Sequence, residues 1–182
     1  MSVSDDKKAL RSAIRMVMRG ITPEDQFRMD MMMHRNLLRQ PWLHEADLIL
    51  CYCSTKAEPD THWLIGWAFD NGKQIALPVC TAQGEMHFYV IRSMAELRRG
   101  KYGILEPTGR EEAVITEKTL CIVPAVAFTE DGRRLGKGGG YYDRFLEANP
   151  KLRTIGLTYH RLLQEDIPCE PHDKGVDTVV TD

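Results

Sequence analysis

The chain has 182 residues, of which 43% are hydrophobic and 27% charged, a composition typical of a soluble globular protein with a full core. Its 24 basic and 26 acidic side chains give a net charge of −2, so no global field favours nucleic acid or a membrane surface. No apolar run approaches the ~20 residues of a membrane helix, and the charged start of the chain lacks a signal-peptide core. We therefore expect one domain over residues 1–182, in the cytoplasm, with no membrane or nucleic-acid partner.

The 5 cysteines are odd in number and include no C-x-x-C pair. Cys51, Cys53, Cys80 and Cys121 lie in or beside apolar runs, which predicts reduced thiols in the core of a cytoplasmic protein. Zinc binding is disfavoured, because the C-x-C pair has no second pair of ligands.

The chain begins with two predicted helices. Ser4 is the expected cap of the first helix, which ends at Gly20. One of its sides carries a basic stripe of Lys8, Arg11, Arg15 and Arg19. Pro23 occupies the first position of the second helix, which runs to about Gln40. Its methionines are expected to fill the core: Met29, Met31, Met32 and Met33.

After Pro41, apolar runs alternate with helical segments. We predict strands over 47–52, 74–79, 86–91, 120–123, 154–157 and 176–181. Helices are predicted over 62–70 and 141–148, with a short one from Ser93. This alternation indicates an α/β fold, a three-layer sandwich with a mostly parallel central sheet and helices on both faces.

Two of these strands lead into polar loops. Ligands of open α/β sheets bind beyond the carboxyl ends of the strands. The strand at 47–52 leads toward Glu58, and the strand at 120–123 leads toward a glycine-rich loop. We therefore expect both loops to border one cleft.

The glycine-rich loop is the most informative segment, and residues 132–144 read G-R-R-L-G-K-G-G-G-Y-Y-D-R. Glycines expose backbone N–H groups and permit positive φ, so a polyanion can approach the main chain. Arg133, Arg134 and Lys137 add positive charge, and Asp143 follows inside the next helix. The segment therefore predicts a site for a polyphosphate with its metal, although a mobile loop with turn glycines stays open. The spacing is neither that of a Walker A loop nor that of a dinucleotide-binding motif.

Residues 134–144 resemble the signature of the 5-formyltetrahydrofolate cyclo-ligase family. Three weaker matches agree in order and span nearly the whole chain: Lys7-Lys8-Ala9-Leu10-Arg11, Glu58-Pro59-Asp60-Thr61 and Asp173-Lys174-Gly175-Val176-Asp177. One departure is Tyr102, which stands where some members carry a tryptophan; a tyrosine can still stack on a pterin-like ring.

The resemblance implies an ATP- and Mg²⁺-dependent ligase that converts 5-formyltetrahydrofolate to 5,10-methenyltetrahydrofolate and releases ADP and phosphate. The expected route transfers the γ-phosphate to the formyl oxygen, and attack by N10 then closes the ring. The expected partners are these two small molecules, and the chain is expected to be a monomer.

The resemblance also implies site residues. ATP is assigned to Lys7, Lys8, Arg11, Arg134, Leu135, Gly136, Lys137, Gly138, Gly139, Gly140, Tyr141 and Tyr142. Folate is assigned to Arg11, Cys53, Glu58, Tyr102, Lys137, Gly138, Gly139, Gly140 and Tyr141. Catalytic roles are assigned to Lys137, Arg134 and Tyr142. Mg²⁺ is assigned to Asp143 and Asp173, with Asp177 competing for the second position.

Plainer interpretations stay open for these residues. The basic stripe also fits solvated surface charge, Asp143 also fits a helix-dipole role, and Asp173 also fits a turn. Glu58 also fits an ordinary loop carboxylate, and the two tyrosines fit helix anchors as well as ligand contacts. The alternative to catalysis is a sensor that binds a phosphorylated metabolite or folate without turnover. No histidine shows a pattern that predicts catalysis; His172 beside Asp173 comes nearest.

Overall fold

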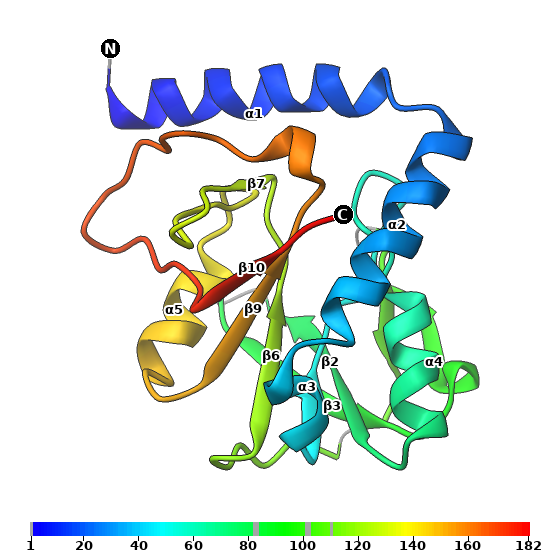
Figure 1. The fold of residues 1–182 in the computed structure, drawn as a ribbon. Helices are drawn as coiled ribbons and strands as arrows, with labels where there is room; N and C mark the ends of the chain where they lie inside the picture. The colour runs from blue at the N-terminus through cyan, green and yellow to red at the C-terminus, as the bar shows by residue number, and fades with distance from the viewer. Residues whose placement is uncertain (1, 82–83, 101–102, 110) are drawn as a thin grey trace.

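A computed structural model of the chain describes residues 2–81, 84–100, 103–109 and 111–182, and its centre is a six-stranded sheet (Figure 1). The strands follow the order β10-β9-β6-β1-β2-β3. Their bounds are β1 (Leu48–Leu50), β2 (Gln74–Cys80), β3 (Met86–Ile91), β6 (Thr119–Val123), β9 (Arg153–Leu157) and β10 (Thr178–Val180). Neighbouring strands are parallel except β2 and β3, which are antiparallel. The prediction of a mostly parallel central sheet is therefore confirmed.

Two short sheets lie outside the central one. Their strands are β4 (Leu97–Arg99) with β5 (Leu105–Pro107), and β7 (Ala127–Phe128) with β8 (Arg134–Leu135). The second pair bears on function, because β8 consists of the third and fourth residues of the segment 132–144 predicted as a glycine-rich loop. These two residues are fixed by pairing with β7, and the open part of the loop begins only at Gly136.

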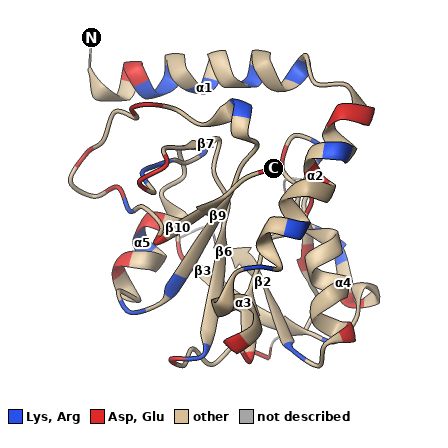
Figure 2. Ribbon diagram, viewed as in Figure 1, with Lys and Arg blue, Asp and Glu red and all other residues tan. Residues whose placement is uncertain are grey.

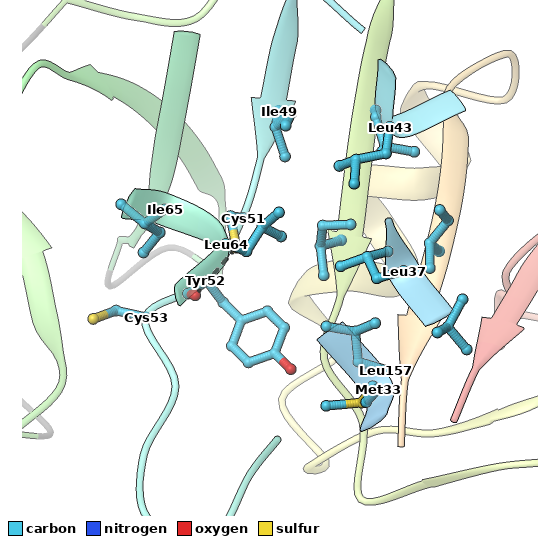
Figure 3. Packing of buried hydrophobic residues seen from close by; sticks show 14 of the residues in the cluster. Met33, Leu37, Leu43, Ile49, Cys51, Tyr52, Cys53, Leu64, Ile65 and Leu157 are labelled. Atoms are coloured by element: carbon cyan, nitrogen blue, oxygen red, sulfur yellow. Dashed lines mark hydrogen bonds between the residues drawn. The ribbon is translucent and has the colours of Figure 1, made fainter. Parts of the chain in front are cut away.

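Helices cover both faces of the central sheet. They are α1 (Val3–Arg19), α2 (Pro23–Leu37), α3 (Pro41–Glu45), α4 (His62–Asp70) and α5 (Tyr141–Ala148), with 3₁₀ turns η1 (Met94–Glu96) and η2 (His160–Leu162). Because successive strand residues point to opposite faces, Ile49 packs in the layer of α2 and α4, whereas Leu50 packs in the layer of α5. Figure 1 shows this separation of α5 from α2 and α4, and Figure 3 shows Met33 and Leu37 of α2 within the first layer. The predicted three-layer α/β sandwich is confirmed.

The N-terminal helix starts earlier than predicted. Ser2, not Ser4, is its cap, because Ser2 Oγ accepts the Asp5 amide at 3.2 Å and Asp5 Oδ2 accepts the Ser2 amide at 3.2 Å. The residues of α1 that are buried are Lys7 and Ile14, so the helix lies along the molecule with one narrow contact face.

The second helix buries one stripe only. Met29 and Met33 are buried, but Met31 and Met32 are 52% and 56% exposed, so the prediction that all four methionines fill the core was wrong. Positions i and i+4, here Met29 and Met33, share a helix face, whereas Met31 and Met32 point away from the sheet. The helix also ends at Leu37 rather than near Gln40.

Other boundaries shift as well. The strand predicted over 47–52 is limited to 48–50, the last strand is limited to 178–180, and the helix expected from Ser93 is a single 3₁₀ turn. All five cysteines are free, yet Cys80, at the end of β2, is exposed, so its prediction as a core thiol was wrong. No helix in the described part of the chain combines the length and apolar character needed to cross a membrane.

Candidate active site

The loops that follow β1 and β6 meet at the carboxyl edge of the sheet. Strands β1 and β6 are parallel neighbours, so their following segments leave the sheet side by side. Lys137 Nζ of the glycine-rich loop lies 2.6 Å from Glu58 Oε1 of the other loop. The structure thus brings together two segments that lie far apart in the sequence.

Glu58 is held firmly within its own loop. Its side chain is only 7% exposed, and Oε2 accepts hydrogen bonds from the Thr55 amide at 2.9 Å and from Thr55 Oγ1 at 2.8 Å. The Lys137 side chain is 52% exposed. The carboxylate is therefore the fixed member of this ion pair, and the ammonium group is the member free to move.

The glycine loop owes its conformation to a few positions. Gly138 and Gly140 adopt φ values of 102° and 67°, a region that L side chains rarely enter. Gly140 is also the residue that precedes α5, so the N-terminus of that helix opens toward the loop. Leu135, by contrast, is fully buried, and its carbonyl accepts the Val126 amide at 2.7 Å, so this residue belongs to the interior.

Arg134 lies beneath the loop in a buried ion pair. Its Nη2 is 2.6 Å from Asp143 Oδ1, and the two side chains are 4% and 17% exposed. Arg134 Nε also donates to the Lys174 carbonyl at 3.1 Å, while the Lys174 amide donates to Asp143 Oδ1 at 3.0 Å. Arg134 and Asp143 are therefore joined to each other and to the C-terminal segment.

Helix α1 supplies the remaining predicted cations, and Figure 2 shows basic residues along its length. Arg11 Nε donates to the Gly136 carbonyl at 2.7 Å, and Lys7 Nζ lies 2.9 Å from Glu170 Oε2 and 2.5 Å from Asp173 Oδ2. Burial opposes the charge of Lys7, but the two carboxylates outweigh it and raise its pKa. Lys8 is exposed. Two of the three predicted residues on α1 thus reach the site.

The two predicted metal ligands, Asp143 and Asp173, both lie next to the peptide group that joins residues 173 and 174. Asp143 accepts from the Lys174 amide, and the preceding residue, Asp173, points its carboxylate at Lys7. Burial opposes ionisation of Asp173, but Lys7 outweighs it and lowers the pKa of this carboxyl group. Carboxylate oxygens are the ligands that Mg²⁺ prefers, so this donor set fits such an ion chemically.

Asp177, the competing residue, is engaged in the sheet. Its Oδ2 accepts from the Thr154 amide at 2.8 Å and from Thr154 Oγ1 at 2.7 Å, at the start of β9. Asp173 lies within 4.8 Å of Glu170 and His172, counted between their ligand atoms, so it is the better placed of the two.

The two tyrosines differ in their surroundings. The Tyr142 ring packs edge-on against Phe88, and its buried hydroxyl has no hydrogen-bond partner among the described residues. Burial raises the pKa of Tyr142 well above its usual value. The Tyr141 ring lies under Arg144, 5.3 Å from the guanidinium carbon to the ring centre. Tyr102 lies outside the described residues.

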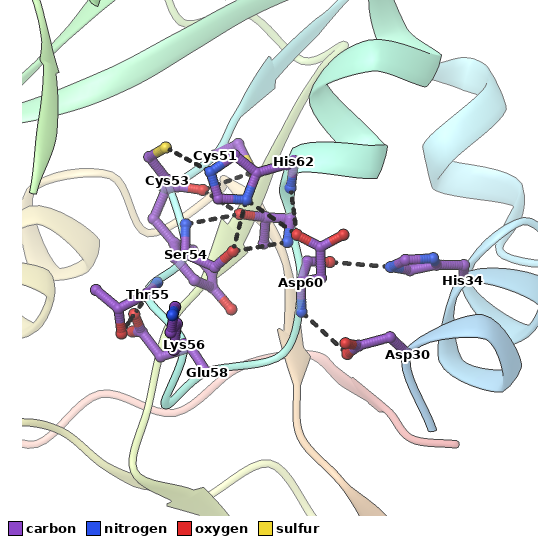
Figure 4. A network of polar contacts seen from close by, with 12 residues as sticks. Asp30, His34, Cys51, Cys53, Ser54, Thr55, Lys56, Glu58, Asp60 and His62 are labelled. Atoms are coloured by element: carbon purple, nitrogen blue, oxygen red, sulfur yellow. Dashed lines mark hydrogen bonds and ion pairs between the residues drawn. The ribbon is translucent and has the colours of Figure 1, made fainter. Parts of the chain in front are cut away.

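One polar network was missed by sequence reasoning (Figure 4). His62 Nε2 lies 3.3 Å from Cys53 Sγ, and His62 Nδ1 lies 2.9 Å from Asp60 Oδ1. Cys53 was predicted as a folate contact, but nothing was predicted for His62. The one signal in the sequence is its position at the start of a helix, two residues after an aspartate.

Two open cavities lie at the opposite edge of the sheet. They have volumes of about 390 and 570 Å³ and share Glu117 and Arg153 in their linings. Thr119 and Arg153 begin β6 and β9, so both cavities face the amino ends of the strands, and neither contains a predicted site residue. We favour the carboxyl edge because the charged groups converge there.

Comparisons with known proteins identify the family of the chain. The sequence matches the model of the 5-formyltetrahydrofolate cyclo-ligase family over residues 3–182. The 5-formyltetrahydrofolate cyclo-ligase of Escherichia coli (strain K12) is 32% identical over 174 residues, covering 92% of this chain and 96% of that protein. The enzyme of that name from Mus musculus is 27% identical over 194 residues, covering 99% and 95%.

Solved structures give the same result. The NMR structure of Aquifex aeolicus 5,10-methenyltetrahydrofolate synthetase superimposes with a TM-score of 0.81 at 30% identity, over 96% of this chain and 88% of that chain. The synthetase from Mycoplasma pneumoniae, at 22% identity and a TM-score of 0.77, supports the fold alone. Since the family model spans nearly the whole chain and relatives above 30% identity cover most of it, the chain belongs to the 5-formyltetrahydrofolate cyclo-ligase family of ligases.

Proposed function

We propose that this chain catalyses the ATP-dependent conversion of 5-formyltetrahydrofolate to 5,10-methenyltetrahydrofolate, with release of ADP and phosphate. The observation that carries the proposal is the 2.6 Å ion pair between Lys137 and Glu58. It joins the loop suited to a polyphosphate with a buried carboxylate suited to the N–H groups of a reduced pterin. The names of the E. coli and mouse relatives support the same reaction.

The chemistry explains why ATP is needed. The formyl oxygen is a poor leaving group, so it first takes the γ-phosphate. N10 then attacks the formyl carbon, the ring closes, and phosphate leaves. Catalysis of this kind rests mainly on positioning the reactants and on neutralising phosphate charge.

The nucleotide half would be formed by the glycine loop and α1. Gly138 and Gly140 allow backbone N–H groups to converge on the phosphates, together with the N-terminus of α5. The half-exposed Lys137 side chain is free to move, so it would leave Glu58 and bind the γ-phosphate. Lys7 and Arg11 would reach the phosphates from α1, and the exposed Lys8 has the weakest case.

The folate half would be formed around Glu58. Its fixed carboxylate would accept hydrogen bonds from the pterin, with Cys53 in the same loop and Tyr141 across the site.

Two residues assigned to catalysis would act on the nucleotide from beneath the glycine loop. Tyr142 would donate a hydrogen bond to the phosphates, since its phenol stays protonated near neutral pH. Arg134 would stabilise negative charge that develops on the transferred phosphate, because it lies next to the N-terminal turn of α5, where it pairs with Asp143.

Mg²⁺ would neutralise phosphate charge and orient the nucleotide, held by Asp143 and Asp173. Both carboxylates now bind a cationic side chain, Arg134 and Lys7 respectively. Binding the ion would therefore require each aspartate to turn from its present partner. We also propose that the chain acts as a monomer in the cytoplasm, and a dimer by size-exclusion chromatography with light scattering would contradict the first part.

The test is a turnover assay with 5-formyltetrahydrofolate, ATP and MgCl₂. We expect growth of the near-ultraviolet band of the methenyl product, with one ADP released per product. Binding of both ligands without ADP release would instead support a sensor.

Two variants test the placement of the substrates. Glu58→Gln should raise KM for folate more than KM for ATP, and Lys137→Met should chiefly impair nucleotide use. Arg15→Met, an exposed change on the same helix as Arg11, is the matched control and should leave both constants unchanged. If Lys137→Met altered folate affinity alone, the placement of Lys137 would be wrong.

A further inference from the structure

The Cys53 thiol belongs to a hydrogen-bonded chain whose other members, His62 and Asp60, have no role in the proposed reaction (Figure 4). Cys53 Sγ lies 3.3 Å from His62 Nε2, and the other ring nitrogen lies 2.9 Å from Asp60 Oδ1. This is the order of a nucleophile, a base and an orienting carboxylate. Asp60 Oδ1 also accepts the backbone amide of His62 at 3.0 Å, which fixes the carboxylate relative to the ring.

The surrounding loop holds this chain in place. Asp30 of α2 accepts the Asp60 amide at 3.1 Å. Thr61 Oγ1 donates to the Tyr52 carbonyl at 2.5 Å and accepts the Ser54 amide at 3.0 Å, so the two ends of the loop are tied together. The approach of His62 to the sulfur is therefore determined by the fold of the loop.

Charge distinguishes Cys53 from the other cysteines. The hydrogen bond that the His62 ring makes to Asp60, and then the one that it makes to Cys53, raise the pKa of His62 to about 10, so the ring is protonated near neutral pH. A protonated ring at this distance can give a proton to a group that leaves the sulfur. Burial raises the pKa of Cys51 to about 12 and also raises the pKa of the thiols at 80, 121 and 169.

The geometry points to Cys53 as a site of reversible oxidation by small hydroperoxides, with His62 as the proton donor. Cys53 is 6% exposed, whereas the His62 side chain is 43% exposed, so only a small reagent reaches the sulfur, and it does so past the ring. A hydroperoxide meets this size limit, and larger disulfides do not.

The reaction balances with these groups. The thiolate attacks one peroxide oxygen, an S–O bond forms and the O–O bond breaks. His62 gives its proton to the departing hydroxide, which leaves as water. Sulfur is oxidised by two electrons to a sulfenic acid and the peroxide is reduced. The added oxygen displaces His62 and opens access to the sulfur, so a low-molecular-weight thiol can displace water to give a mixed disulfide, and a second thiol releases Cys53.

Oxidation would act on the folate half of the site. Cys53 and Glu58 belong to one closed loop, so an added oxygen on the sulfur displaces His62 and disturbs the loop that positions the Glu58 carboxylate. This consequence rests on the proposed function, whereas the reactivity of Cys53 does not.

The reactivity is tested by treating the purified chain with hydrogen peroxide, removing the excess with catalase, unfolding the chain in urea and then trapping sulfenic acid with dimedone. Peptide mass mapping then gives a rate for each cysteine. We expect Cys53 to react at least about tenfold faster than the exposed Cys80 and Cys169. His62→Gln should remove this advantage, while His87→Gln, which loses a similar carboxylate-bound imidazole at Glu112, should not. Equal rates at the three cysteines in the unmodified sequence would overturn the inference, whether or not the variants fold.

The effect on the site has a separate readout. Peroxide should abolish folate turnover, and dithiothreitol should restore it, in a variant carrying Cys80→Ser and Cys169→Ser. Full turnover with Cys53 fully oxidised would overturn the link to the folate half. Absence of turnover before any peroxide is added would instead count against the proposed function, and the rate comparison would still decide the reactivity of Cys53.

Discussion

The ion pair between Arg134 and Asp143 makes the sharpest prediction about stability. Arg134→Met removes the guanidinium group but keeps an aliphatic side chain. The variant leaves the Asp143 carboxylate, which is 17% exposed, with only the Lys174 amide as a described partner. Breaking one partner of a buried pair costs ~3–5 kcal/mol, and the partial exposure of Asp143 favours the lower end, about 3 kcal/mol. For a domain of this size we expect a fall in Tm of about 6–12 °C.

A neighbouring arginine provides the control. Arg133 has a side chain 39% exposed and pairs with Asp131 and Asp166, which are 66% and 76% exposed. Arg133→Met should therefore cost under ~1 kcal/mol. Urea unfolding followed by circular dichroism measures both changes in the free energy of unfolding.

A double-mutant cycle tests the cause. In Asp143→Asn the carboxylate charge is gone, so adding Arg134→Met should cost at least ~1 kcal/mol less than it does in the unmodified sequence. Additive effects, or equal effects of the two arginine variants, would refute the reasoning. Asp143→Asn is also a better test of the metal site than Asp143→Ala, because the side-chain oxygen of asparagine can still accept the Lys174 amide.

Three further predictions concern single residues. Asp177→Ala should lower the free energy of unfolding by ~1–3 kcal/mol, because it leaves donors at the start of β9 unpaired. The Mg²⁺ concentration at which Asp177→Ala reaches half of its maximal turnover should match that of the unmodified chain. A higher Mg²⁺ requirement would indicate that Asp177, and not Asp173, is the second ligand. The raised pKa of His62 stabilises the fold fully below about pH 6.5 and no longer does so once the pH passes about 10. The difference in unfolding free energy between the unmodified chain and His62→Gln should therefore narrow across that range, and a constant difference would contradict the assignment. Gly132→Ala would place a Cβ 2.2 Å from the Val176 carbonyl oxygen at a φ of 89°, so thermal unfolding should show a loss of at least ~1 kcal/mol.

Much of the fold was predictable because local signals mark its boundaries. The strand at 86–91 was predicted to the residue, and the helices predicted from His62 to about Asp70 and from Tyr141 to about Ala148 have those bounds. Asn71-Gly72 ends the first helix, and Gly140 precedes the second. The ends of β1 and β10 carry no such signals and are set by pairing with neighbouring strands. Strand pairing joins residues far apart in the sequence, so these ends could not be predicted from local sequence.

The site was predictable only at the level of segments. Strand order brings the Glu58 loop to the glycine loop, so their meeting followed from the α/β pattern. The partner of each charged group did not follow, because it depends on side-chain directions in the folded chain. Arg134 shows this most clearly: it lies in the glycine segment, but pairing of β8 with β7 turns it into the interior.

The observed pairings change how the site would work. Three ion pairs join residues proposed to bind phosphate with residues proposed to bind folate or metal: Lys137–Glu58, Lys7–Asp173 and Arg134–Asp143. A carboxylate as buried as Glu58 would be costly without a partner, so the pairs stabilise the site before any ligand arrives. Under the proposed assignments, each ligand must displace one member of a pair and thereby frees the other. ATP taking Lys137 releases Glu58 for the pterin, and folate taking Glu58 releases Lys137 for the phosphate. The cost of breaking that pair falls on whichever substrate binds first, so each substrate should favour binding of the other by the same factor.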